Sequence, residues 1–219
     1  MGVALKMIMT EKEKIIQIGK NMNCKCNFAG DFIWARCGSV FTVVCNDDYV
    51  TKISSMNLDA PSLEIISGFR MLEHLDLTRS EKISELPECI SKLTTLKILN
   101  FTYMGLTELP EWIGNLTELE ELILRHNRIT ELPDSISNLI QLKGLSLNHT
   151  DLIKLPEDIG NLENLEWLDI HGTYVERLPR SLANIPNLKS LRVDGSTMSQ
   201  NKNSTGYLEA LIYSKIMYG

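Results

Sequence analysis

The chain has 219 residues with 28 acidic and 22 basic side chains, and its net charge is −6. This balance excludes the basic field that a phosphate-driven nucleic-acid binder usually carries, so no nucleic-acid partner is expected. Hydrophobic residues make up 43% of the chain, and no run approaches about 18 consecutive apolar residues. We therefore expect a folded chain without a membrane span.

A short helix is predicted near the start of the chain. Thr10 and Glu13 form a capping-box pattern, in which each side chain satisfies a free backbone N–H at the helix start. Apolar Ile15 and Ile18 follow. We expect the helix to end near Gly19.

Four of the five cysteines of the chain lie within 22 residues: Cys24, Cys26, Cys37 and Cys45. Disulfides in an oxidising compartment would explain such a cluster. Buried free thiols in a cytosolic protein are a second interpretation. A four-cysteine zinc site is a third, although the Cys24-Lys25-Cys26 spacing is one residue tighter than the usual CxxC ligand pair.

From residue 72 the chain repeats itself. Six blocks of the form LxxLxL occur at spacings of 24, 23, 23, 23 and 23 residues, and they open at Leu72, Leu96, Leu119, Leu142, Leu165 and Leu188. A degenerate block opens at Val50, so about seven rungs are expected. A period of this length is typical of solenoids, in which each repeat buries its apolar side against the next.

The residue pattern of one block predicts its local structure. The alternating leucines of the LxL segment indicate a short strand with leucines on one face. A proline recurs later in each block and fits the first position of a helical or 3₁₀ turn, where its missing N–H is not needed. Acidic residues follow four of these five prolines, as a helix N-terminus favours. The prolines are Pro87, Pro110, Pro133, Pro156 and Pro179.

The shared template, LxxLxLxxNxLxxLPxxIxxLxx, resembles the leucine-rich repeat family over residues 50–196, and in particular its 23-residue LPxxI subclass. That subclass occurs in intracellular Ras-pathway scaffolds, plant intracellular proteins and bacterial proteins. The resemblance implies an α/β solenoid: a curved leucine-rich repeat with a parallel β-sheet on its concave face and short 3₁₀ or helical turns on its convex side.

The asparagine column of that template is poorly kept in this chain. In the family, this asparagine satisfies backbone groups of the neighbouring coil. Serine and threonine can supply a hydroxyl in its place, whereas methionine cannot, so we expect a local irregularity at Met104. The column reads Ser80, Met104, Asn127, Thr150, Thr173 and Ser196.

Residues 1–49 and 197–219 do not follow the repeat. The stretch CGSVFTVVCNDDYVTKI resembles the N-terminal cap of extracellular leucine-rich repeat proteins, and the resemblance implies pairing of Cys37 with Cys45. Residues 1–49 are thus expected to form a cap with a helix and four cysteines. At the other end, Leu208, Leu211 and Ile212 predict a C-terminal capping helix over 197–219.

The strand residues that point away from the leucines form the candidate binding surface. All four histidines fall on it, and His126 and His149 occupy the same column of adjacent rungs, about 5 Å apart. A polar binding face, a pH-sensitive contact and a metal site are the interpretations left open, although no further metal ligand is clearly placed. The candidate partner-binding residues are Ile98, Tyr103, Ile123, Arg125, His126, His149, Trp167, Asp169 and His171.

No catalytic motif is present, and neither a cofactor nor a metal is expected. We expect a monomeric, non-enzymatic module that binds another protein on its concave β-face, as a scaffold or an effector. This would place it in the cytoplasm or among secreted effectors. The alternative is an extracellular or surface recognition domain, similar to a receptor or adhesin, with a disulfide-stabilised N-terminal cap.

Overall fold

The computed structural model describes residues 11, 13–18, 20–21, 26–29, 32–36, 40–46, 49–83 and 85–194. For residues 26–29, 32–36, 40–41 and 46 it describes the backbone alone. The chain divides into two compact units, Met1–Met104 (unit 1) and Gly105–Gly219 (unit 2).

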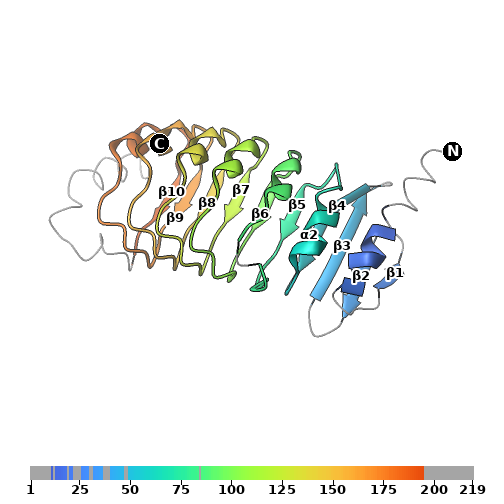
Figure 1. The fold of residues 1–219 in the computed structure, drawn as a ribbon. Helices are drawn as coiled ribbons and strands as arrows, with labels where there is room; N and C mark the ends of the chain where they lie inside the picture. Colours follow the sequence, from blue (N-terminus) through green and yellow to red (C-terminus); the bar gives the residue numbers. More distant parts are fainter. Residues whose placement is uncertain are drawn as a thin grey trace. The chain divides into compact units, whose positions relative to one another are not determined.

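Unit 1 begins with an antiparallel part that the sequence pattern did not predict. Residues 13–18 are helical, and the strands β1 (Cys26–Ala29), β2 (Phe32–Arg36), β3 (Val40–Asn46) and β4 (Tyr49–Ser55) follow in an antiparallel arrangement (Figure 1). Ile15 and Ile18 are buried, as expected of the short helix. Glu11 accepts a hydrogen bond from the backbone N–H of Val50 (2.9 Å), which links this helix to β4.

The repeats begin at β4, where the pairing changes from antiparallel to parallel. β4 pairs in parallel with β5 (His74–Asp76), and β5 with β6 (Ile98–Asn100). The first coil carries the α-helix α2 (Ala60–Ile66), whose N-terminus is capped by Asp59. The next coil carries the 3₁₀ helix η1 (Glu88–Lys92). The degenerate first rung is therefore confirmed: Val50, Ile53, Leu63, Ile66 and Phe69 are all buried.

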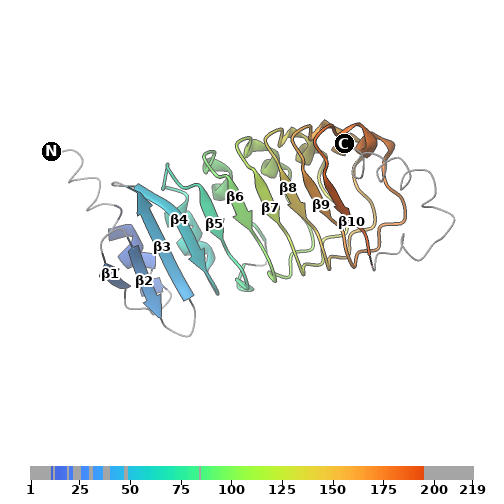
Figure 2. The ribbon, with the colours of Figure 1, turned by 180° about the vertical axis from the view of Figure 1, so that it is seen from behind.

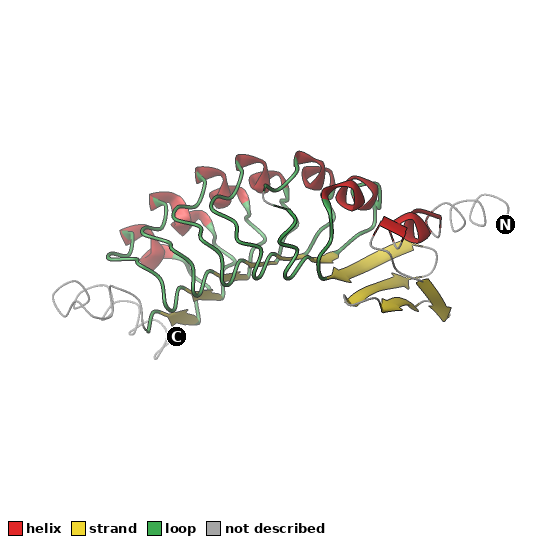
Figure 3. Cartoon of the chain, turned by 60° about the horizontal axis from the view of Figure 1, so that its bottom comes forward, coloured by secondary structure: helices red, strands yellow, loops and turns green. Residues whose placement is uncertain are grey.

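Unit 2 repeats one coil without interruption. Its strands β7 (Glu121–Ile123), β8 (Gly144–Ser146), β9 (Trp167–Asp169) and β10 (Ser190–Arg192) pair in parallel in chain order, as Figure 2 shows from behind. The 3₁₀ helices η2 (Glu111–Asn115), η3 (Asp134–Asn138), η4 (Glu157–Asn161) and η5 (Arg180–Asn184) lie on the side opposite the strands (Figure 3).

The leucines fill the space between strands and helices. In β8, for example, Leu145 is fully buried, and so are Leu122 and Leu168 at the same position of the neighbouring strands. Each coil of both units carries a parallel strand on one side and a short helical turn on the other. The predicted fold class, an α/β leucine-rich repeat solenoid, is confirmed.

The prolines lie one position earlier than predicted. Each is the N-cap residue of its 3₁₀ helix, with extended backbone angles, rather than its first helical residue. Its carbonyl accepts the first hydrogen bond of the turn, as in Ile113 N–H to Pro110 O (3.0 Å). The first turns are acidic in η1 to η4, and η5 is the exception because it starts with Arg180.

The asparagine column works in two different ways. Asn127 Oδ1 accepts from the N–H of Leu106 in the preceding coil (3.1 Å), and Ser80 Oγ accepts in the same way from Leu58. The hydroxyls of Thr150 and Thr173 instead donate to a carbonyl of their own coil, three residues back. Met104 is buried, and Ser196 lies outside the described residues.

Several expectations concern residues that the structure does not describe. Thr10, Cys24, Cys37 and the whole 197–219 segment lie outside the described residues. Cys26 and Cys45 lie on β1 and β3. The strand register places Cys26 beside Ala35 on β2, and Ala35 beside Phe41 on β3. Because Cys45 is four residues beyond Phe41, Cys26 is two strands away from Cys45 and is also displaced from it by four residues along the strand. This register excludes a direct bridge between these two cysteines, and the disulfide cap otherwise stays a prediction.

Candidate functional site

We use the name strand face for the side chains that alternate with the leucines on the parallel strands, together with the second and third residues after each strand, such as Arg125 and His126 after β7. The predicted columns of this face are confirmed by the strand register, which pairs Glu121 with Gly144, Gly144 with Trp167, and Trp167 with Ser190. The nine candidate residues divide between the units. Ile98 and Tyr103 belong to unit 1, and the other seven belong to unit 2.

In unit 1 the two candidates lie among charged and polar neighbours. Ile98 is half-buried and pairs with His74 on β5. Tyr103 is 41% exposed, and the guanidinium of Arg79 lies 5.3 Å from the centre of its ring, within the range of a cation–π contact. Asp76 and Asn100 accept hydrogen bonds from the backbone N–H two residues further on, which tightens the end of each strand.

In unit 2 the strand face is built around a strand of small residues. Gly144 and Ser146 on β8 are buried, although both point away from the core. Trp167 from β9 lies over Gly144: a Cβ there would overlap with two ring carbons of the indole and lie 2.7 Å from its Nε1. Arg125 approaches from the opposite side, and its Nε donates to Ser146 Oγ (2.9 Å). The surface above β8 is thus made by two large side chains from the neighbouring rungs.

Three of the four histidines form a continuous row, here called the imidazole row: His126, His149 and His171. The rings of His126 and His149 stack with a centroid distance of 4.6 Å and an interplanar angle of 15°, which confirms the predicted proximity. His149 and His171 meet edge to face at 4.7 Å and 81°. Burial, His149 and Arg125 together lower the pKa of His126 below its ordinary value.

The backbone explains why these rings can stack. His126 and His149 have φ values of 55° and 56°, in the left-handed region, as do Arg79 and Tyr103 in the same column of unit 1. The last member of the column is Gly172 (φ 66°), where a Cβ would lie 2.7 Å from Nδ1 of His149. The absence of a side chain at Gly172 therefore leaves the space that the ring of His149 occupies.

Acidic residues hold the far end of the row. Nδ1 of His171 lies 2.9 Å from a carboxylate oxygen of Asp194, which also pairs with Arg192 (3.1 Å). The hydrogen bond from Arg192 is the largest cause of a lowered pKa at Asp194. Asp169 accepts a hydrogen bond from the backbone N–H of His171 (3.0 Å).

Four residues of this site were missing from the candidate set: Gly144, Ser146, Arg192 and Asp194. The sequence could have predicted the role of Gly144 and Ser146, because the repeat register places these two small residues beside Trp167 and near Arg125. The role of Asp194 depends on side-chain conformations that no spacing predicts. Among the described residues, no group of three or more His, Cys, Asp and Glu side chains is arranged to hold a metal ion.

A ladder of alternating charge borders the strand face. The residue after the first leucine of each block is in turn Glu, Lys, Glu, Lys, Glu and Lys. In unit 2, Lys143 pairs with Glu120 (2.6 Å) and Lys189 with Glu166 (2.8 Å), and in unit 1 Lys97 pairs with Glu73 (2.8 Å). Each of these exposed ion pairs contributes little to stability. The alternation of charge nevertheless places an acidic residue of one coil beside a basic residue of the next, which favours the native order of the coils.

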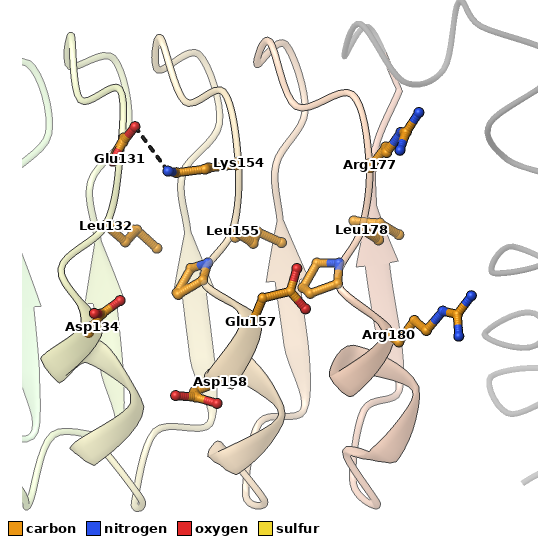
Figure 4. Close-up of a pocket in the computed structure, with 12 residues that line it drawn as sticks. Glu131, Leu132, Asp134, Lys154, Leu155, Glu157, Asp158, Arg177, Leu178 and Arg180 are labelled. Carbon is orange, nitrogen blue, oxygen red and sulfur yellow. Dashed lines mark ion pairs between the residues drawn. The ribbon is translucent and has the colours of Figure 1, made fainter.

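A second concave feature lies away from the strands, beside Pro156 and Pro179, the prolines that precede η4 and η5. Figure 4 shows this pocket of about 570 Å³, with Leu132, Leu155 and Leu178 at its floor. Its rim is acidic at one end and basic at the other, where Arg177 and Arg180 lie. The floor leucines are at most 8% exposed, so the pocket offers little apolar area and is a groove between adjacent coils.

The comparisons with known proteins identify the family. Residues 52–143 and 134–215 match the family described as "leucine-rich repeat region", and together they cover about three quarters of the chain. The chain belongs to the leucine-rich repeat family. No curated protein matches it in sequence.

Solved structures with the same fold include two plant receptors and a type III effector domain. The ectodomain of the receptor kinase GASSHO1/SCHENGEN3 from Arabidopsis thaliana, solved in complex with CASPARIAN STRIP INTEGRITY FACTOR 2, is 28% identical with a TM-score of 0.55; the match covers 61% of this chain and 16% of that one. The plant peptide hormone receptor RGFR1, solved in complex with RGF2, is 27% identical with a TM-score of 0.61 over 71% and 25% of the two chains.

The leucine-rich repeat domain of the type III effector XopL is 27% identical with a TM-score of 0.55, and the match covers 64% of this chain and 51% of that one. The present chain thus spans between 16% and 51% of the length of these three relatives. None of the helices in the described part of the chain has the length and apolar character needed to cross a bilayer.

Proposed function

We propose that the chain is a non-enzymatic protein-interaction module and that its partner binds the strand face of unit 2. The observation that carries the proposal is the arrangement above β8, where Trp167 and Arg125 cover a strand of small residues. Tryptophan and arginine are the side chains most enriched among residues that dominate binding energy. Half-buried Ile123, beside Ser146 in the register, extends this surface with an apolar group.

The family supports a protein as the partner. Two of the similar structures are receptors solved with another named factor, and a third is an effector domain. The 23-residue spacing and the recurring LPxxI segments lead us to place the chain in the subclass of that spacing. The same strand face would serve a scaffold, an effector or a receptor, because binding depends on the face and not on the cellular compartment.

The second candidate, an extracellular recognition domain, is favoured by the similarity to the two plant receptors. It requires an oxidised N-terminal cap, which involves Cys24, Cys26, Cys37 and Cys45. Thiol titration of denatured protein from its native host separates the two candidates. Bridged cysteines would support the extracellular role, and four free thiols in this cap would contradict it.

The binding proposal is tested by affinity capture from the native host with the full chain as bait. The double variant Trp167→Ala/Arg125→Ala should lose the partner that the wild type retains. A matched control, Ile140→Ala/Ile153→Ala, removes two isoleucines that are 54% and 52% exposed outside the strand face, and it should retain the partner. Equal loss in both double variants would contradict the proposed location.

A further inference from the structure

The groove beside Pro156 and Pro179, here called the proline groove, has a gradient of charge along its length. Its volume is about 570 Å³, and three consecutive coils of unit 2 supply its lining side chains (Figure 4). The formal charge of these side chains is −2 in the first coil, −1 in the second and +2 in the third. They are Glu131 and Asp134, then Lys154, Glu157 and Asp158, and finally Arg177 and Arg180.

The basic end of the proline groove departs from the pattern of the repeat. The residue before each Leu-Pro pair is in turn Glu85, Glu108, Glu131, Lys154 and Arg177, and the residue after it is Glu88, Glu111, Asp134, Glu157 and Arg180. A helical turn favours an acidic residue at its start, so Arg180 opposes the local preference of η5. A local preference that is broken in this way is typical of functional positions.

The two arginines have no acidic partner in the part of the chain that the structure describes. Lys154 pairs with Glu131 (3.2 Å), whereas neither Arg177 nor Arg180 takes part in an ion pair. Both arginine side chains are exposed, and Figure 4 shows them projecting from one coil, on either side of Leu178. Two guanidiniums placed in this way can contact the same group of carboxylates through charge-assisted hydrogen bonds.

The opposite end of the proline groove offers carboxylates that are equally accessible. Asp134 and Asp158 are exposed, and neither forms an ion pair with another described residue. The walls between the two ends are rigid, because Pro156 and Pro179 hold their φ angles at −63° and −65°. Since the floor leucines are nearly fully buried, an occupant is recognised mainly by its charges.

We propose that the proline groove binds an extended segment of a protein in which a basic cluster and an acidic cluster lie about four residues apart. The acidic cluster contacts Arg177 and Arg180, and the basic cluster contacts Asp134 and Asp158. Three coils at the strand spacing span about 10 Å, which an extended chain covers with three to four residues. A uniformly charged polymer fits less well, because one end of the groove repels it. This second surface is separate from the strand face and does not depend on the function proposed for it.

The probe is the hexapeptide Lys-Lys-Ser-Ser-Glu-Glu, and its control is Lys-Glu-Ser-Ser-Glu-Lys, which has the same composition and net charge. Both peptides carry an acetylated N-terminus and an amidated C-terminus, so that only their side chains are charged. Binding to the full chain is measured by fluorescence anisotropy at pH 7.5 and an ionic strength of about 0.05 M. The first peptide should bind about tenfold tighter than its control, and about 0.5 M salt should reduce the difference to less than about twofold.

Variants at each end assign the binding to the proline groove. Arg177→Gln/Arg180→Gln should weaken binding of the first peptide about fivefold, and so should Asp134→Asn/Asp158→Asn. The matched controls remove the same charges from exposed positions of unit 2 outside the groove and should bind like the wild type. They are Arg128→Gln/Lys189→Gln for the basic end and Glu118→Gln/Glu163→Gln for the acidic end.

Three results would overturn the inference. The first is equal affinity of the wild type for the two peptides, and the second is an equal loss in the groove variants and their controls. The third is dimerisation of the wild type in sedimentation velocity that Arg177→Gln/Arg180→Gln abolishes, because the occupant would then be a second copy of the chain. Trp167→Ala/Arg125→Ala should bind the first peptide like the wild type, so a failure of the strand-face proposal is distinguishable from a failure of this one.

Discussion

The indole of Trp167 lies over Gly144 on the adjacent strand, in the space that any other residue at position 144 would fill with its Cβ. Gly144 is consequently buried although it faces away from the core, and Trp167 is partly buried. Part of the tryptophan's apolar area is thus used inside the molecule. The remaining ring surface is already fixed in one orientation, so less side-chain conformational entropy of Trp167 is lost when a partner binds.

Replacing Gly144 with Ala should displace the indole, because a side chain moves more easily than the strand beneath it. We expect a loss of about 1–3 kcal/mol in the free energy of unfolding, as is usual for added volume in a filled space. In protein labelled with 5-fluorotryptophan, the ¹⁹F resonance of Trp167, assigned with Trp167→Phe, should shift. Ser190→Ala, on the other side of Trp167 in the same column, should leave it in place. An unchanged resonance in Gly144→Ala would contradict the packing.

Leu145→Ala should destabilise unit 2 strongly. Leu145 is fully buried in the middle of β8, and truncation of a buried leucine costs about 2–5 kcal/mol because the neighbouring coils cannot close the cavity. Urea unfolding followed by circular dichroism measures the change. Thr130→Ala, an exposed position in the same unit, should stay within about 0.5 kcal/mol of the wild type. Similar losses in the two variants would show that the core was wrongly assigned.

Stability should fall with acidification through His126. Its folded pKa is lowered, chiefly by burial, with contributions from His149 and Arg125, so the unfolded chain binds the proton more readily. The neutral form is therefore favoured by folding, and stability is lost as the pH falls below about 6.5 toward the lower folded value. The decrease in Tm between pH 7.5 and pH 5.0 should be smaller in His126→Gln than in the wild type. An unaltered slope in His126→Gln would refute the assignment.

Cys89 should react slowly with iodoacetamide while the protein is folded. Its thiol is buried, and burial together with the nearby Glu64 raises its pKa to about 11. The thiolate is the reactive form, and at pH 8 its population should be a few hundredfold lower than in an ordinary cysteine of pKa about 8.5. Mass spectrometry of the peptide that contains Cys89 gives the alkylation rate. The same peptide in denatured protein is the control, and comparable rates in the two states would contradict the burial.

The sequence predicted the repeats more completely than the start of the chain. Leu122, Leu145 and Leu168 lie where the fixed spacing puts them, because each coil can bury its leucines only against the same positions of the next. The strands β1 to β3 were not predicted. They lie outside the repeat, so no periodic pattern of leucines predicts them. Their pairing is antiparallel, unlike that of the repeats.

The candidate site was predicted as a set of columns but not as an arrangement. His126 and His149 were expected to be neighbours, since a parallel register brings equal positions within about 5 Å. The buried state of Ser146 and the shared role of Asp194 were not expected. Both depend on which way long neighbouring side chains turn, and spacing carries no information on that.

By itself, the sequence determined that this protein is a leucine-rich repeat solenoid and determined which residues share its strand face, because the period of the leucines sets the register. The tertiary structure alone decided that Trp167 covers Gly144, that Arg125 is fixed by Ser146, and that the imidazoles stack. These contacts join residues of different coils about 20 positions apart, and they follow from the sizes and rotamers of side chains that meet only once the coils are stacked.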